Sequence, residues 1–185
     1  MPAELTGQRV AFLVANEGIE QVELTDPWQA MEQAGATPEL IAPNPGQAQA
    51  FHHLDKANRF PVQTAVADAR VDDYVGLVLP GGVANPDRLR MDPNAVAFVR
   101  GFAEAGKPIA AICHAPWTLV EADVVRGKTL TSWPSLRTDI RNAGADWVDE
   151  DVVLSPENGY LLVTSRKPDD LPAFCREAVQ AFAKV

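Results

Sequence analysis

The hydrophobic pattern of the chain alternates between short apolar runs and longer segments with helical spacing. Two of the runs, residues 9–14 and 76–79, are almost continuously apolar. Such runs are typical of strands that are buried on both faces of a parallel sheet. The alternation predicts an α/β fold in which helices cover both faces of a mostly parallel sheet.

The same patterns set the expected limits of the individual elements. The predicted strands are residues 9–14, 38–42, 76–79 and 108–112, followed by a hairpin of 152–155 with 160–164. The predicted helices are a first one that carries Val22, Leu24, Trp28 and Met31 and stops at Gly35, and then 93–105, 115–122, 135–143 and 171–184. In the first helix, Asp26 and Pro27 indicate a new cap or a kink. For the helix 93–105 we expect Asp92 as N-cap and Gly106 just after its end.

Residues 43–61 contain Pro, Gly, Gln, His and Asn without a clear period. They predict a long surface loop, and such loops often border a functional site. His52, His53 and Asp55 lie in this segment, but consecutive histidines lack the spacing of known metal ligands. We therefore expect a solvated loop and no metal site.

Composition narrows the class of protein. The chain has 185 residues, of which 46% are hydrophobic and 22% are charged, so we expect one globular domain, 1–185. Lys and Arg number 16 against 25 Asp and Glu, and this net charge of −9 disfavours binding to duplex nucleic acid. The sequence shows no signal peptide and no apolar run long enough for a membrane helix, so we expect a cytoplasmic protein without a membrane partner.

The segment around Cys113 carries the clearest chemical signal. The strand 108–112 runs directly into this cysteine, and Ala111 and Ala115 lie two positions on either side, where a sharp strand-to-helix turn needs small residues. A thiol at a helix N-terminus is expected to have a lowered pKa. His114 can act as a general base or acid beside it. The alternatives are a buried core cysteine and a packed histidine.

Four separated motifs carry a family resemblance: Asn-Glu-Gly-Ile-Glu-Gln-Val-Glu at 16–23, Leu-Pro-Gly-Gly at 79–82, Ala-Ile-Cys-His-Ala-Pro at 111–116 and Thr-Asp-Ile-Arg-Asn-Ala-Gly at 138–144. Together they resemble the ThiJ/PfpI superfamily, nearest to its branch of PfpI-like intracellular proteases and general stress proteins. The resemblance covers nearly the whole chain. It implies a flavodoxin-like three-layer sandwich that forms dimers or hexamers, with peptidase, glyoxalase or deglycase activity.

By position, the resemblance implies that Cys113 is the nucleophile and His114 its companion, with a loop carboxylate beside the thiol. Glu20 and Glu23 are the candidates for that carboxylate, because a spacing of three places them on one helical face. A protonated acid there would donate a hydrogen bond to the thiolate, and the two groups would titrate as a unit. The alternative for both is a solvated helix start.

The resemblance also assigns supporting residues. Gly81 and Gly82 would donate backbone amides to an oxyanion, or simply form a tight turn. Asp87 stands where PfpI-type proteases place a Glu that reaches the histidine of a neighbouring subunit, and its side chain is shorter. Trp133 and Trp117 replace a Tyr and a Gln of some relatives and would make the pocket more aromatic.

We therefore expect a stress-protection protein that acts as a cysteine-dependent hydrolase or deglycase. Its substrate would be a small carbonyl compound, a glycated adduct or a peptide, and no cofactor is expected. The site would lie near an interface of a homo-oligomer. Two alternatives are a redox sensor that works through oxidation of Cys113 and a chaperone-like binding protein without turnover.

Overall fold

A three-layer α/β sandwich is present in the computed structural model, which describes residues 4–185. Its central sheet has seven strands in the order β11-β12-β8-β7-β1-β3-β6, and every neighbouring pair is parallel except β11 with β12. The strands are β1 (Arg9–Leu13), β3 (Thr37–Ala42), β6 (Thr64–Ala65), β7 (Gly76–Leu79), β8 (Ile109–Ile112), β11 (Val153–Ser155) and β12 (Leu162–Ser165). This arrangement confirms the predicted fold class.

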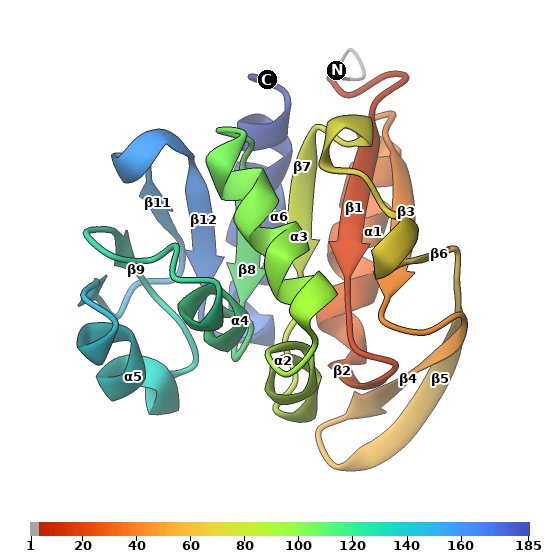
Figure 1. Ribbon diagram of the computed structural model, residues 1–185, viewed down its shortest axis with the longest axis horizontal. Helices are drawn as coiled ribbons and strands as arrows, with labels where there is room; N and C mark the ends of the chain where they lie inside the picture. The colour runs from red at the N-terminus through yellow and green to blue at the C-terminus, as the bar shows by residue number, and fades with distance from the viewer. Residues whose placement is uncertain (1–3) are drawn as a thin grey trace.

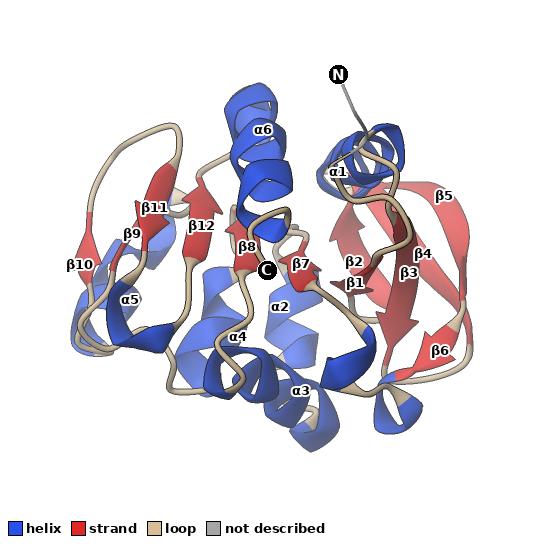
Figure 2. Ribbon diagram, turned by 90° about the horizontal axis from the view of Figure 1, so that it is seen from above, coloured by secondary structure: helices blue, strands red, loops and turns tan. Residues whose placement is uncertain are grey.

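Helices cover the sheet on both faces (Figures 1 and 2). Helices α1 (Gln21–Gln33) and α6 (Leu171–Phe182) pack on one face, and α3 (Pro93–Glu104) and α4 (Pro116–Glu121) pack on the other. In β1, Val10 and Phe12 belong to the core under α1 and α6, whereas Ala11 and Leu13 belong to the opposite core. Both faces of the strand are therefore apolar, which explains its unbroken hydrophobic run.

Several shorter elements complete the fold. They are α2 (Ala84–Leu89), α5 (Arg137–Asn142), the parallel pair β9 (Thr129–Leu130) and β10 (Asp146–Trp147), and single 3-10 turns at Val66–Asp68, Val71–Asp73, Pro134–Leu136, Glu157–Gly159 and Pro168–Asp170. None of the helices in the described part of the chain is long and apolar enough to cross a membrane.

Local sequence signals predicted the limits of several elements correctly. Helix α3 starts as expected, because the Asp92 carboxylate accepts a hydrogen bond of 2.8 Å from the Ala95 amide. Gly106 follows its end with a φ of 70°. Strands β11 and β12 form the predicted antiparallel hairpin.

Of the two alternatives for the first helix, a new cap at Asp26 or a kink at Pro27, the cap is wrong. Helix α1 begins at Gln21 and continues through Pro27, so Asp26 is not a cap. Proline inside a helix removes one backbone hydrogen bond. Here Leu24, Pro27 and Met31 are buried, and burial of this face holds the helix together across the missing bond.

The expected loop at 43–61 is wrong, because most of it forms a β-hairpin. Strands β4 (Gly46–His52) and β5 (Asp55–Val62) pair antiparallel and join β2 (Glu17–Glu20) in a second sheet with the order β2-β4-β5. The hairpin is largely exposed, and Ala48 and Ala50 are its buried residues. So few apolar positions give no alternating pattern in the sequence.

Candidate active site

The carboxyl ends of neighbouring parallel strands β7 and β8 meet at one edge of the sheet, and the site lies there. Strand β8 leads directly into Cys113, and β7 leads through Pro80 into Gly81 and Gly82. A Cβ atom built on Gly81 would lie 2.6 Å from the Cβ of Cys113 and 2.8 Å from the carbonyl oxygen of Ile112. No larger residue fits at Gly81 without moving the nucleophile's turn.

Cys113 itself has a backbone φ of 64°, which is unfavourable for a residue with a side chain. Its amide donates to the carbonyl of Ser165 at 3.0 Å, and its carbonyl accepts from the amide of Trp133 at 2.8 Å. These two bonds hold the left-handed conformation in place. The predicted sharp turn between strand and helix is therefore present, with the cysteine at its apex.

A cavity of about 230 Å³ opens onto the Cys113 side chain. It is lined by Glu20, Glu23, His53, Leu54, Gly82, Val83, Cys113, His114, Trp133 and Pro168. The structure thus brings together six of the residues singled out in the sequence: Cys113, His114, Glu20, Glu23, Gly82 and Trp133. Gly81 lies directly behind them, against Glu23 and Cys113.

His114 is in direct contact with the thiol. Its Nδ1 lies 3.0 Å from Sγ of Cys113. The imidazole stacks on Trp133, with ring centroids 5.7 Å apart, and meets Trp117 edge-on at 5.3 Å. Burial lowers the pKa of His114 to about 4, so the ring is neutral at neutral pH.

Glu23 is the carboxylic acid placed beside the thiol. Its side chain is fully buried, and burial, reinforced by the charge of Glu20, raises its pKa to about 8. Within the described chain neither carboxyl oxygen has a partner with full hydrogen-bond geometry. The Cys113 thiol and the amides of Gly81 and Gly82 nevertheless lie near enough to oppose this rise in pKa. Glu23 is therefore mostly protonated at neutral pH and has a proton to donate.

Glu20 faces the same cavity but has a different partner. Its Oε2 accepts a hydrogen bond of 3.0 Å from the backbone amide of His53, at the tip of the β4–β5 hairpin. Of the two candidate acids, Glu23 lies at the sulfur and Glu20 holds the hairpin tip over the site. The hairpin therefore borders the cavity, as the sequence predicted for residues 43–61.

The pKa of the Cys113 thiol differs from the expectation. Burial raises it, and a charged Glu23 raises it further, whereas the amides of Gly82 and His114 lower it. Burial outweighs the amides because helix α4 is short and starts only at Pro116. The thiolate is favoured when Glu23 is protonated, since the repulsion between the two charges then becomes a hydrogen bond.

Two predicted residues lie outside the cavity. Asp87 is exposed on α2 and lines a separate surface hollow with Arg90 and Arg100. Trp117 contacts the site only through His114, and its Nε1 donates to Asp139 at 2.9 Å. Trp133 lines the cavity and stacks on His114.

Four residues that line the cavity were not assigned to it from the sequence: His53, which was expected in a solvated loop, Leu54, Val83 and Pro168. His53 and Leu54 lie at the hairpin tip, and Val83 precedes the short helix α2, which the sequence did not predict. No motif marks these positions. The sequence placed residues 43–61 beside a site, but which of them reach the cavity could be found only from the folded chain.

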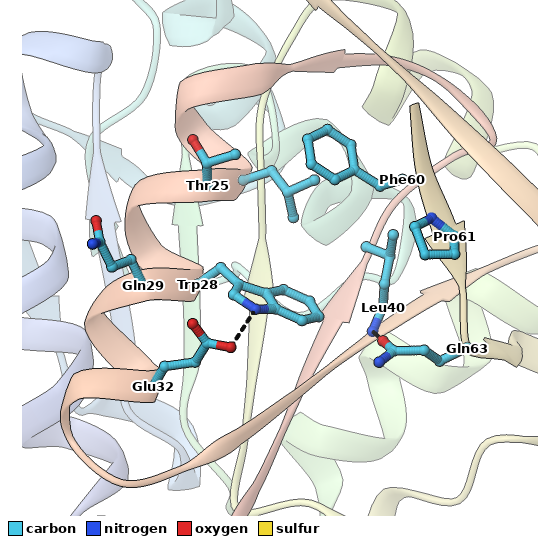
Figure 3. A pocket seen from close by; sticks show the side chains of 9 residues that line it. Thr25, Trp28, Gln29, Glu32, Leu40, Phe60, Pro61 and Gln63 are labelled. Atoms are coloured by element: carbon cyan, nitrogen blue, oxygen red, sulfur yellow. Dashed lines mark hydrogen bonds between the residues drawn. The ribbon is translucent and has the colours of Figure 1, made fainter. Parts of the chain in front are cut away.

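A second cavity lies between α1 and strands β3 and β5 (Figure 3). It measures about 280 Å³ and is lined largely by apolar side chains, including Trp28, whose Nε1 donates to Glu32 at 3.1 Å. It contains no Cys, His, Ser or Lys side chain. Elsewhere in the described residues, no group of three Cys, His, Asp or Glu side chains could hold a metal ion. The Cys113 cavity is therefore the candidate active site.

Comparison with known proteins gives a consistent result. The model of the DJ-1/PfpI family matches residues 8–181. A Bacillus subtilis protein named putative cysteine protease YraA is 38% identical over 93% of this chain and 96% of its own length. The Escherichia coli protein/nucleic acid deglycase 2 is 37% identical over 94% of this chain and 96% of its own length. The Bacillus subtilis general stress protein 18 is 36% identical over 96% of this chain and 99% of its own length.

Solved structures show the same fold. Drosophila melanogaster DJ-1beta superimposes with a TM-score of 0.82 at 27% sequence identity, covering 96% of this chain and 91% of that one. A two-domain protein from Anabaena variabilis, with DJ-1/ThiJ/PfpI-like and ferritin-like domains, superimposes with a TM-score of 0.84 at 32% identity. The match covers 94% of this chain and 49%, about half, of that protein.

The backbone strain at Cys113 gives a first prediction. We expect Cys113→Gly to be more stable than Cys113→Ala by about 1 kcal/mol, because glycine adopts a positive φ without steric cost. At Cys175, inside helix α6, we expect the opposite order, with Cys175→Ala more stable than Cys175→Gly by about 1 kcal/mol. Urea unfolding of the four variants measures both differences. Equal stability of the two variants at position 113 would show that the turn is not strained.

The buried acid gives a second prediction. Because the pKa of Glu23 is raised to about 8, the folded protein holds a proton that the unfolded chain has lost. The resulting stability is complete below about pH 4.5 and is lost as the pH rises through about 8. Urea unfolding at several pH values should show this decline, and Glu23→Gln should flatten it. Glu17→Gln, which changes a half-exposed carboxylate paired with Arg88, is the control; an unaltered slope in Glu23→Gln would contradict the assignment.

Proposed function

Because this chain belongs to the DJ-1/PfpI family, we propose that it is a stress-protection enzyme that attacks carbonyl groups through Cys113. The observation that carries the proposal is the placement of a thiol, a neutral imidazole and a buried carboxylic acid around one cavity. The cavity volume of about 230 Å³ favours a small carbonyl compound or glycated group over a peptide. Deglycase-type chemistry is therefore preferred to peptidase activity.

The first chemical step is the same for each of these substrates. As the sulfur of Cys113 forms a bond to the carbonyl carbon, the π electrons of the carbonyl move to its oxygen, and the thiol proton passes to Nδ1 of His114, which lies 3.0 Å from Sγ. Transfer during bond formation avoids a separate thiolate, which the raised pKa of Cys113 and the lowered pKa of His114 both disfavour. Gly82 lines the cavity, and its amide lies close enough to Cys113 to lower the pKa of the thiol, so it is placed to stabilise the negative charge that develops there.

The separated pKa values give the two titratable neighbours different roles. The His114 ring is neutral, with a pKa near 4, and has a lone pair that can accept a proton. Glu23 is mostly protonated, with a pKa near 8, and can donate one to the new alkoxide. Two groups whose surroundings drive their pKa values apart form a suitable acid and base pair.

A third prediction tests the nucleophile. We expect Cys113→Ser to lower turnover by more than about a hundredfold, while Cys175→Ser, which changes the other thiol, leaves it intact. The assay compares methylglyoxal, a glycated thiol and a fluorogenic peptide as substrates. Methylglyoxal or the glycated thiol should be consumed faster than the peptide.

The same variants separate the alternatives. A redox sensor would turn over none of the three substrates, yet mild peroxide would oxidise Cys113 before Cys175 in a peptide map. A chaperone-like protein would protect client proteins from aggregation equally well with Ser at position 113. Loss of turnover in Cys175→Ser alone would overturn the proposed nucleophile.

We also propose that the protein acts as a homo-oligomer, a dimer or a hexamer, with the site near an interface. Asp87 is exposed and does not line the cavity of its own chain, so it can act on His114 only from a neighbouring copy. We expect light scattering to show an oligomer at micromolar concentration. Asp87→Asn should reduce activity, and Asp72→Asn, also exposed, should not. A fully active monomer would contradict the shared site.

A further inference from the structure

The walls of the Cys113 cavity carry two acidic side chains. Glu20 and Glu23 line it, together with His53 and His114, and none of its described lining residues is Lys or Arg. Glu23 is largely protonated because burial raises its pKa to about 8. The charge of Glu20, which helps to raise the pKa of Glu23, is the negative charge that lines the cavity.

The basic residues next to Pro168 are already engaged. Arg166 donates to Asp170 at 2.9 Å and to Asp149 at 2.8 Å, and Lys167 lies 3.5 Å from Asp169. Each of these cations thus already has a carboxylate partner. A carboxylate or phosphate that entered the cavity would meet Glu20 without a free cation to balance it.

The mouth of the cavity is unusually apolar. Six large hydrophobic side chains are well exposed in the described part of the chain, and three of them line this cavity: Leu54 at 93%, Val83 at 58% and Trp133 at 39%. They come from the hairpin tip, the turn before α2 and the loop after β9. Isolated exposed apolar residues are common, but their convergence on a reactive thiol indicates a binding surface.

We propose that this cavity selects neutral carbonyl compounds with an apolar substituent and excludes those that carry a carboxylate or phosphate, with Glu20 setting the charge preference. The carbonyl carbon would lie at Sγ of Cys113. The substituent would pack against Leu54, Val83 and Trp133. The carbonyl part of this inference rests on the proposed function, whereas the charge preference belongs to the cavity itself.

Thiol reagents of matched size test the charge preference without any turnover. Iodoacetamide and iodoacetate both alkylate a thiolate with loss of iodide, and they differ in one negative charge. Peptide mapping gives the two rates at Cys113, and mercaptoethanol provides the reference ratio. Both reagents react with the same thiolate, so at one pH the thiolate fraction cancels from the ratio of the two rates. After comparison with the mercaptoethanol ratio, the remaining difference reports the charge of the cavity.

We expect the ratio of the iodoacetamide rate to the iodoacetate rate to be about tenfold higher at Cys113 than in mercaptoethanol. Glu20→Gln should bring the ratio down towards the mercaptoethanol value. Glu17→Gln removes the same charge from β2 at a residue that does not line the cavity, and should leave the ratio high. A ratio equal to that of mercaptoethanol, or one unchanged in Glu20→Gln, would overturn the proposal.

The apolar mouth has a parallel test. Iodoacetanilide, which adds a phenyl ring to iodoacetamide, should alkylate Cys113 about tenfold faster than iodoacetamide does, relative to mercaptoethanol. Val83→Ser should reduce this advantage, while Leu154→Ser, an exposed change on β11, should not. No advantage for the phenyl reagent would refute the apolar subsite.

Carbonyl substrates then separate this proposal from the proposed function. Methylglyoxal should be turned over and glyoxylate, which carries a carboxylate, should not. If the alkylation ratios hold but no carbonyl compound is consumed, the proposed function fails and the charge preference stands. If both carbonyl compounds are consumed equally and the alkylation ratio at Cys113 equals that of mercaptoethanol, the charge preference fails and the proposed function stands.

Discussion

The site depends on one backbone constraint, the left-handed conformation of Cys113 at the end of a central parallel strand. Strand β8 pairs with β7 on one side and β12 on the other, so its end is fixed. The turn then needs space, which Gly81 provides on the neighbouring strand end. The seven-stranded sheet supplies the rigidity that compensates for the local cost of the turn. The remaining site residues are positioned around a sulfur atom that cannot move far.

A second feature, the uncharged state of Glu23, follows from burial. A carboxyl group beneath the sheet edge, near the Glu20 charge, retains its proton because an anion there would lack solvation. The site therefore combines a thiol, a neutral ring and a neutral acid, and none of the described residues that line its cavity is Lys or Arg. In the proposed function, the site works by exchange of protons among these neighbours rather than through a permanently charged nucleophile.

The sequence predicted the elements whose signals are local and left out those that depend on distant contacts. The run 9–14, the Asp92 cap and the small residues around Cys113 each act within a few positions, and the structure contains the features they predict. The hairpin 46–62 has few buried residues, so its pattern resembled a loop. Which of the acids meets sulfur was equally hidden, because Glu20 and Glu23 differ in their partners rather than in their spacing.

The β4–β5 hairpin contributes to the entrance of the cavity but little to the core that stabilises the fold. It pairs with β2 rather than with the seven-stranded sheet, and its tip, with Leu54, is exposed. Residues at that tip can change with little effect on the core, while the nucleophile turn tolerates almost no change. Divergence among proteins of this architecture should therefore alter the entrance to the cavity more readily than the chemistry at its base.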